Sequence, residues 1–197
     1  MSQLKLTADS GGGTVAIKGP ASTTGNAAIE LTIPGTGNST LLTSETNTGK
    51  ILQVVSTYNT THISTTSTSF VDSGISATIT PSSSSSKILI QSTFNVGSSD
   101  TQTVYFKLYN GSSEITAATN ANSSNGSAFT AALNHGSGAQ FDINQVGHNF
   151  LYTSNTTSAT TIKVYWRCDT GTVYFNRYGY STAVGGGSAL TLYEVAA

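Results

Sequence analysis

Residues 160–168, Thr-Thr-Ile-Lys-Val-Tyr-Trp-Arg-Cys, show the pattern that decides the fold. Apolar and polar side chains alternate along this stretch, which is the period of a β-strand with one buried face. Ile162, Val164 and Trp166 fall on one face, and the charged and hydroxyl-bearing residues between them fall on the other. The pattern predicts a strand over Thr160–Cys168, with Trp166 as an anchor of the core.

Similar segments recur at regular intervals from Lys50 onward, with turn residues between them. Such spacing is typical of a β-sandwich or barrel. The core positions include Ile88 and Ile90 in one strand and Val104, Phe106 and Leu108 in another. The other predicted strands are Ile51–Thr57, His62–Val71, Ile75–Thr80, Lys87–Val96, Thr103–Tyr109, Ser113–Thr119, Ala128–Leu133, Gln140–Tyr152, Thr172–Arg177 and Ala189–Val195.

The segments between the predicted strands contain residues that are typical of turns and loops. Asn110-Gly111 predicts a type I′ hairpin turn, and Asp169-Thr170-Gly171 predicts a tight turn. Pro81 and the five serines Ser82–Ser86 predict the end of a strand and a flexible loop. In the last strand, Ala189–Val195, both faces carry apolar residues. The sequence therefore leaves open which face is inside, or whether both are buried at a subunit contact.

The first 48 residues contain no aromatic residue. Strands are predicted at Gln3–Thr7, Thr14–Lys18 and Ala27–Ile33, and three such short strands bury too little to stand alone. We therefore expect an N-terminal β arm over 1–48 that packs on another surface, with 43–49 as the linker and a larger domain over 49–197. The apolar residues expected to make the arm's contacts are Leu4, Leu6, Val15, Ile17, Ile29, Leu31 and Ile33.

Charge is scarce, because only 17 of the 197 residues are Lys, Arg, Asp or Glu, and Ser, Thr, Asn and Gly together make up 96. A net charge of -1 without a basic cluster argues against nucleic-acid binding. Apolar runs are too short to span a membrane, and the N-terminus has no secretory signal pattern. The 17 aromatic residues argue against disorder.

The few charges also leave the sheet edges without their usual protection, since natural edges are blunted by Lys, Pro or inward charges. Neutral, Thr-rich strands would pair with other copies unless they are covered. A closed symmetric oligomer would consume these edges, and we expect one here.

No catalytic motif is present, and we expect neither enzyme activity nor a cofactor. His135 and His148 could meet across a hairpin and bind a metal, but ordinary polar roles in loops are favoured, so no metal is expected. Arg167 could lower the pKa of Cys168, although a buried strand cysteine is the better interpretation. The most suggestive surface candidate is Tyr174–Tyr180.

Tyrosine faces with amide and guanidinium groups nearby commonly bind sugars. The candidate glycan-binding residues are Asn176, Arg177, Tyr178 and Tyr180. The alternative, which we favour, is that alternate aromatics belong to the core and the others lie at a subunit interface.

Several segments resemble a module of virion proteins of tailed bacteriophages, especially those of cyanobacteria and other marine bacteria. These segments are Gly49–Val55, Ser64–Asp72, Ile79–Pro81, Ser85–Ile90 and Ala189–Val195, and the start, Leu4–Asp9 with Ile29–Pro34, is similar to short repeats that open phage fibre proteins. The resemblance implies a homotrimer with an N-terminal virion-attachment arm and a C-terminal, jelly-roll-like antiparallel β-sandwich knob.

Two roles follow from this resemblance. In the first, the protein decorates or cements the capsid, with the arm docked on the major capsid protein or another virion protein. In the second, it is a receptor-binding tail fibre tip that recognises host surface glycans. An arm of 48 residues gives little shaft, which favours capsid decoration. Either role places the protein in the virion, assembled in the host cytoplasm, with no nucleic-acid partner and no membrane insertion.

Overall fold

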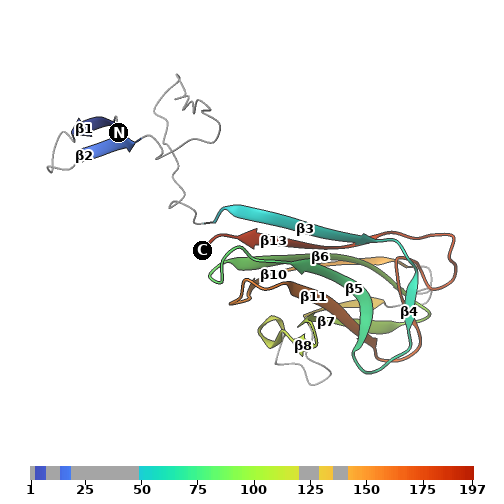
Figure 1. The fold of residues 1–197 in the computed structure, drawn as a ribbon. Helices are drawn as coiled ribbons and strands as arrows, with labels where there is room; N and C mark the ends of the chain where they lie inside the picture. Colours follow the sequence, from blue (N-terminus) through green and yellow to red (C-terminus); the bar gives the residue numbers. More distant parts are fainter. Residues whose placement is uncertain (1–2, 8–13, 19–48, 120–128, 135–141) are drawn as a thin grey trace. The chain divides into compact units, whose positions relative to one another are not determined.

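The computed structural model describes residues 3–7, 14–18, 49–119, 129–134 and 142–197 (Figure 1). The chain divides into two compact units, Met1–Leu42 and Thr43–Ala197. The predicted strand Ala27–Ile33 lies outside the described residues, as do most of the linker and Phe141.

The N-terminal unit contains an antiparallel hairpin of β1 (Gln3–Thr7) and β2 (Thr14–Lys18). Both strands have the predicted bounds. The register sets Leu4 opposite Ile17 and Leu6 opposite Val15. Four of the seven apolar arm residues therefore share one two-stranded ladder.

The second unit is a sandwich of two antiparallel sheets, as the sequence predicts (Figure 1). In the six-stranded sheet β6 is central, and β10 pairs along one of its sides. On its other side, the first part of β6 pairs with β13, which is followed by β3. The last residues of β6 on that side pair with β12, which is followed by β4. Its members are β3 (Ile51–Asn59), β4 (Ile63–Thr65), β6 (Lys87–Ser98), β10 (Asn144–Thr153), β12 (Val173–Phe175) and β13 (Ser188–Val195).

In the five-stranded sheet β11 lies between β5 and β7, and the far side of β7 pairs with β8 and β9. Its members are β5 (Val71–Ile79), β7 (Gln102–Asn110), β8 (Ser113–Glu114), β9 (Thr130–Asn134) and β11 (Thr160–Cys168). Strand β11 has the predicted bounds, and every second residue along it is buried. The opening pattern of the sequence therefore marks a central strand.

The core fills the space between the two sheets. Trp166 is 1% exposed, and its ring centroid lies 4.4 Å from that of Phe175. Phe175 in turn lies 5.6 Å from both Phe94 and Phe106, so the four rings form one cluster drawn from both sheets. The predicted inward residues of β6 and β7 are all buried, and Trp166 is confirmed as a core anchor.

The structure decides which face of the last strand is inside. Leu190, Leu192 and Glu194 are buried, while the alternate residues of β13, such as Tyr193, are half-buried on the outer face. The buried face therefore carries a carboxylate among its leucines. The loop Ser82–Ser86 packs against this carboxylate, so it is anchored rather than the flexible loop that the sequence predicted.

Two predicted strands are wrong in part. The predicted strand His62–Val71 is interrupted, because the Thr65 and Ser67 hydroxyls accept backbone N–H groups two residues on and turn the chain between the sheets. The predicted strand Ser113–Thr119 is a two-residue β8 followed by a 3-10 turn over Thr116–Ala118.

The hairpin turn after β7 also differs from the prediction. Asn110 pairs with Ser113, so the two central residues are Gly111 and Ser112. Only the first of them, Gly111 at φ 60°, has positive φ. Glycine at the first central position is the signature of a type II′ turn rather than type I′.

Candidate functional site

The described residues offer little for catalysis. Within the described ranges no three His, Cys, Asp or Glu side chains gather into a group that could hold a metal. His148 stands edge-on to Phe129, with ring centroids 4.6 Å apart, and His135 lies outside the described residues. In the part of the chain that the structure describes, no helix has the length and apolar character needed to cross a membrane.

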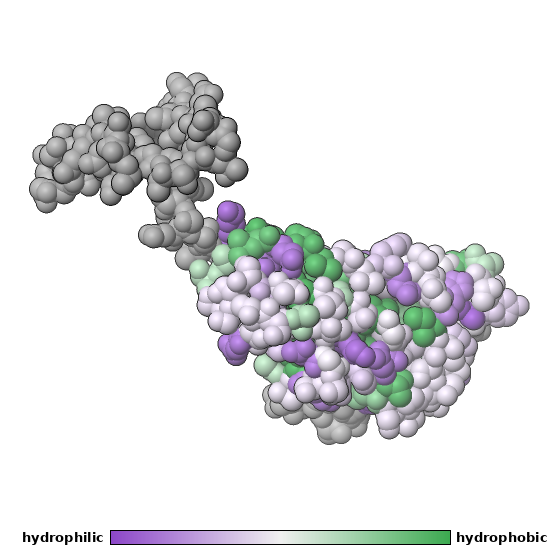
Figure 2. All heavy atoms as spheres, viewed as in Figure 1, coloured by the Kyte–Doolittle hydropathy of each residue, from purple (hydrophilic) through white to green (hydrophobic). Residues whose placement is uncertain are grey.

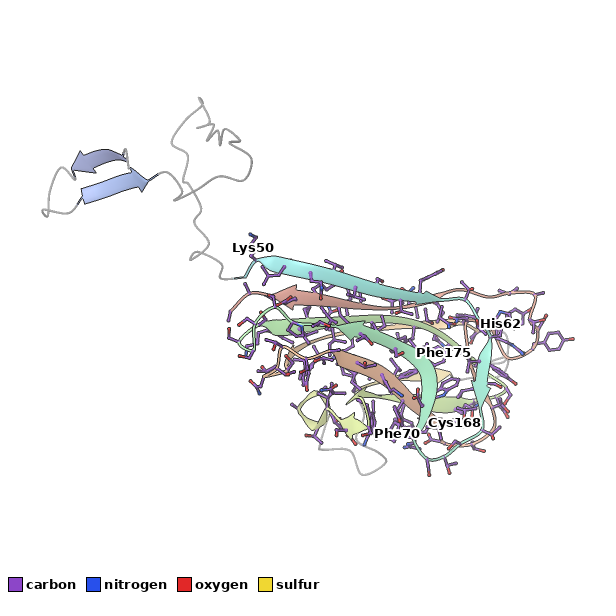
Figure 3. All side chains as sticks on the ribbon, in the orientation of Figure 1. Lys50, His62, Phe70, Cys168 and Phe175 are labelled. Carbon is purple, nitrogen blue, oxygen red and sulfur yellow. The ribbon has the colours of Figure 1, made fainter. Side chains whose placement is uncertain are left out.

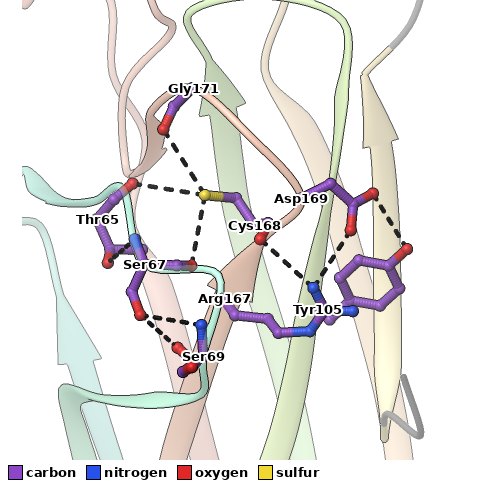
Figure 4. A network of polar contacts seen from close by, with 8 residues as sticks. All are labelled: Thr65, Ser67, Ser69, Tyr105, Arg167, Cys168, Asp169 and Gly171. Carbon is purple, nitrogen blue, oxygen red and sulfur yellow. Dashed lines mark hydrogen bonds and ion pairs between the residues drawn. The ribbon is translucent and has the colours of Figure 1, made fainter. Parts of the chain in front are cut away.

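Cys168 is a packed core thiol, as expected (Figure 4). Its Sγ lies 3.5 Å from the Ser67 carbonyl oxygen and 3.7 Å from that of Gly171. Burial, and after it the neighbouring Asp169, raises the pKa of this thiol. The thiolate that a nucleophile needs is therefore disfavoured, and Arg167 does not activate it.

The Tyr174–Tyr180 segment begins in β12 and continues into the loop that joins β12 to β13. This loop is packed tightly against the end of β6. A side chain on Gly97 would collide with the Arg177 carbonyl, and one on Gly179 would collide with the Ser98 carbonyl. The two glycines allow this close approach of backbones.

Asn176 anchors the loop from inside. It is fully buried with φ 64°, a left-handed conformation that asparagine tolerates better than most residues. Its amide nitrogen donates to the Asn59 and Thr61 carbonyls at 3.0 and 2.9 Å, and its oxygen accepts from Ser188 Oγ at 2.7 Å. Asn176 therefore holds the fold together and does not reach the surface where a glycan would bind.

Arg177 is also partly committed to the loop. Its guanidinium lies 4.1 Å from the Tyr174 ring centroid and donates to the Tyr178 and Gly179 carbonyls at 2.9 and 2.7 Å. Tyr180, by contrast, is 70% exposed. Of the four predicted glycan-binding residues, Tyr180 thus presents the largest aromatic surface to solvent.

A second exposed tyrosine lies at the same end of the sandwich. Tyr58, 69% exposed, pairs with Ala189 at the start of β13, and its ring covers Gly187. This end is opposite the one where the chain enters the sandwich, as the positions of Lys50 and His62 show (Figure 3). Sequence reasoning missed Tyr58, because it belongs to a strand 116 residues before the segment Tyr174–Tyr180.

Sequence reasoning also missed the most enclosed acid of the sandwich. Glu194 is 1% exposed, and its Oε1 accepts from Ser82 N at 2.7 Å and Ser82 Oγ at 2.6 Å. Burial pushes the pKa of Glu194 upward, but hydrogen bonds from Ser82, Ser86 and Ser83 outweigh it and hold the pKa below its ordinary 4.5. The carboxylate therefore serves the fold as a buried anion.

Comparison with known proteins adds little to this description. No family model matches the sequence, and no curated protein matches it. Among solved structures the chain is similar to the crystal structure of the infectious bursal disease virus VP2 subviral particle, with a TM-score of 0.30 and 15% identity. The similarity covers 74% of this chain and 38% of that one, so the chain spans under two fifths of that protein. A likeness of this degree decides neither the fold nor the role of this chain.

Proposed function

We propose that the protein is a structural protein of a tailed-phage virion, a homotrimer that decorates the capsid. Its N-terminal unit docks on the shell, and its β-sandwich projects as a knob. The scarcity of charge, the sandwich fold and the resemblance described above support this role.

One observation carries the proposal. Three of the segments that resemble the phage module lie far apart in the sequence but adjoin one another in the fold: Gly49–Val55, Ser85–Ile90 and Ala189–Val195. The residues of β3 pair with Leu192–Val195 of β13, and Lys87–Ile90 of β6 pair with the same residues from the other side. Ser82 then closes on Glu194. These three segments therefore form one packing unit, as parts of a shared module would, whereas Ser64–Asp72 pairs elsewhere, with β12 and β11.

The edge strand β3 supports the oligomer. It carries no charged residue, and within the described residues its backbone ladder is formed with β13 alone. An uncharged edge strand of this kind is a template for pairing unless a partner covers it. A closed homotrimer would cover it.

Deleting residues 1–48 is expected to abolish incorporation into virions and leave the sandwich folded. The hydrophobic core cluster around Trp166 belongs to the second unit, so the knob keeps this core. The measurement is quantitative mass spectrometry of purified particles, with circular dichroism of the truncated protein. The full-length protein supplied at the same level is the control.

Incorporation of the truncated protein at the full-length level would overturn the docking role of the arm. The copy number in the same particles separates the two virion roles. A number on the scale of the shell protein supports decoration, whereas a few copies per particle supports a fibre.

The exposed tyrosines favour a second candidate, a receptor-binding tip that recognises host glycans. Tyr58 pairs with Ala189 at the start of β13, and Tyr180 lies in the loop whose Gly185 approaches His62, so both rings belong to the end of the sandwich opposite the entry of the chain. Exposed aromatic rings stack on the apolar faces of sugars. A fibre tip would carry its site at this end.

Tyr180→Ala is expected to reduce adsorption of phage to host cells by about tenfold or more if the tip binds glycan. The melting temperature should not change, because the side chain is largely exposed. Val184→Ala, in the same loop and 50% exposed, is the matched control. Equal adsorption of the Tyr180 variant and the wild-type phage would remove the glycan candidate.

A further inference from the structure

The two outer faces of the sandwich differ in charge. The outer face of the five-stranded sheet carries three ion pairs: Lys163 with Asp72 at 2.9 Å, Lys107 with Glu114 at 2.9 Å and Arg167 with Asp169 at 3.2 Å. Two tyrosines, Tyr109 and Tyr165, stack between these pairs with centroids 3.9 Å apart. This outer face is therefore polar and charged, as is typical of a surface exposed to water.

The outer face of the six-stranded sheet carries a row of apolar side chains instead of ion pairs. The register places Val54 of β3 opposite Tyr193 of β13, Tyr193 opposite Leu89 of β6, and Leu89 opposite Leu151 of β10. Directly opposed residues of neighbouring strands share a face. These four residues therefore form a continuous apolar band across four strands.

The apolar band is well exposed. Val54 is 55% exposed and Leu151 52%, and at the β3 end the band continues into Ile51 and Leu52 at 50% and 40%. The hydrophobic region over the first half of β3 is visible in Figure 2. The charged residue on this face, Lys87, lies beside the band and donates to Thr153 Oγ1 at 2.8 Å.

The polar side chains beside the band are bonded to one another. Ser56 Oγ and Thr191 Oγ1 lie 2.8 Å apart, and Tyr193 Oη donates to Gln91 Oε1 at 3.0 Å. When another molecule covers this face, few of its polar groups lose a hydrogen-bond partner. The free-energy cost of removing water is therefore lower than for a surface whose polar groups bond only to water. This face thus combines exposed apolar side chains with polar side chains that already bond to one another.

We propose that the apolar band is a contact between copies of this chain. Within the described strands the charge of this face is that of Lys87 beside the band, so a second copy meets little repulsion there, whereas the ion-paired face would lose its hydration. Four strands at about 4.8 Å and eight residues at about 3.3 Å give a face of roughly 500 Å² in projection. This outer face is therefore large enough for a specific interface at the small end of the size range, under about 600 Å² per partner.

Light scattering after size-exclusion chromatography of the full chain at about 10 µM tests the oligomer. The wild type is expected to run as an oligomer, and Val54→Glu combined with Leu151→Glu as a single chain of 20.3 kDa with an unchanged β-sheet spectrum. Thr78→Glu, an exposed position on the other outer face, is the matched control and stays oligomeric. A monomeric wild type, or a double variant that stays oligomeric, overturns the proposal.

A thiol-protection experiment covers the case in which the double variant does not fold. The thiol introduced by Leu151→Cys is expected to react with a maleimide at least about tenfold more slowly than the thiol introduced by Thr78→Cys. The buried Cys168 serves as an internal reference for a protected thiol. If the Leu151→Cys thiol reacts slowly in a protein of single-chain mass, the chain's own N-terminal segment covers the band.

If the same thiol reacts fast in an oligomer, the copies contact one another elsewhere. Either result overturns the proposal.

Discussion

Trp166→Ala is expected to lower the free energy of unfolding by about 3–5 kcal/mol. The side chain is 1% exposed, and its ring packs at 4.4 Å on Phe175, the ring that joins both sheets. Removing the indole leaves a cavity that the neighbouring rings cannot fill, because they are held by one another. A domain of ordinary stability, about 5–15 kcal/mol, would become marginal.

Urea unfolding followed by far-ultraviolet circular dichroism measures this loss. Trp166→Phe keeps a ring in the site and should lose less than half as much. Thr161→Ala is the control on the same strand, since Thr161 lies on the outer face and loses one hydroxyl contact with Thr78. It should shift the free energy by less than about 1 kcal/mol. Equal losses for Trp166→Ala and Thr161→Ala would contradict the aromatic core described here.

The core was predictable from the sequence because it depends on local alternation. In Thr160–Cys168 the buried face carries Ile162, Val164 and Trp166 and the other face carries the charges, so the period alone decides which side is inside. Strand β13 lacks this contrast. Tyr193 and Val195 look as apolar as Leu190 and Leu192, and Glu194 lies on the buried side. Only the pairing with β6 and β3 resolves the ambiguity.

The candidate site was less predictable for the same reason. The glycan hypothesis treated Asn176 as a surface amide, but its buried side chain makes four hydrogen bonds with Asn59, Thr61 and Ser188, which lie in other segments of the chain. The apolar band is spread over four strands, and β13, β6 and β10 contribute one residue each. No window of sequence contains it, and it emerges only from the register of the sheet.

The serine loop shows how a distant charge orders a segment that looks flexible. Five consecutive serines have no local preference for one conformation. The carboxylate of Glu194, more than a hundred residues later, accepts hydrogen bonds from Ser82, Ser83 and Ser86. Ser86 is 1% exposed as a result, so the loop is part of the packed end of the sandwich.

Glu194→Ala is expected to lower the free energy of unfolding by about 2–4 kcal/mol at neutral pH. The variant leaves several serine donors in a buried site without their acceptor, and such orphaned groups lose their hydrogen bonds to water without compensation. Glu194→Gln keeps the shape and one acceptor oxygen, so it should lose less. Ser85→Ala, which removes only an exposed hydroxyl contact with Ser83, is the control from the same loop.

The pH dependence separates the carboxylate from simple packing. Since the pKa of Glu194 is lowered in the folded protein, the unfolded chain takes up the proton first as the pH falls. The contribution of Glu194 is therefore complete above its ordinary pKa of 4.5, and it declines as the pH drops below that value toward the folded pKa. The stability difference between the wild type and Glu194→Gln should stay constant from neutral pH down to about 5 and then shrink. Urea midpoints across this range measure the difference, and a difference that persists unchanged under acid would show that the charge of Glu194 is not what stabilises the fold.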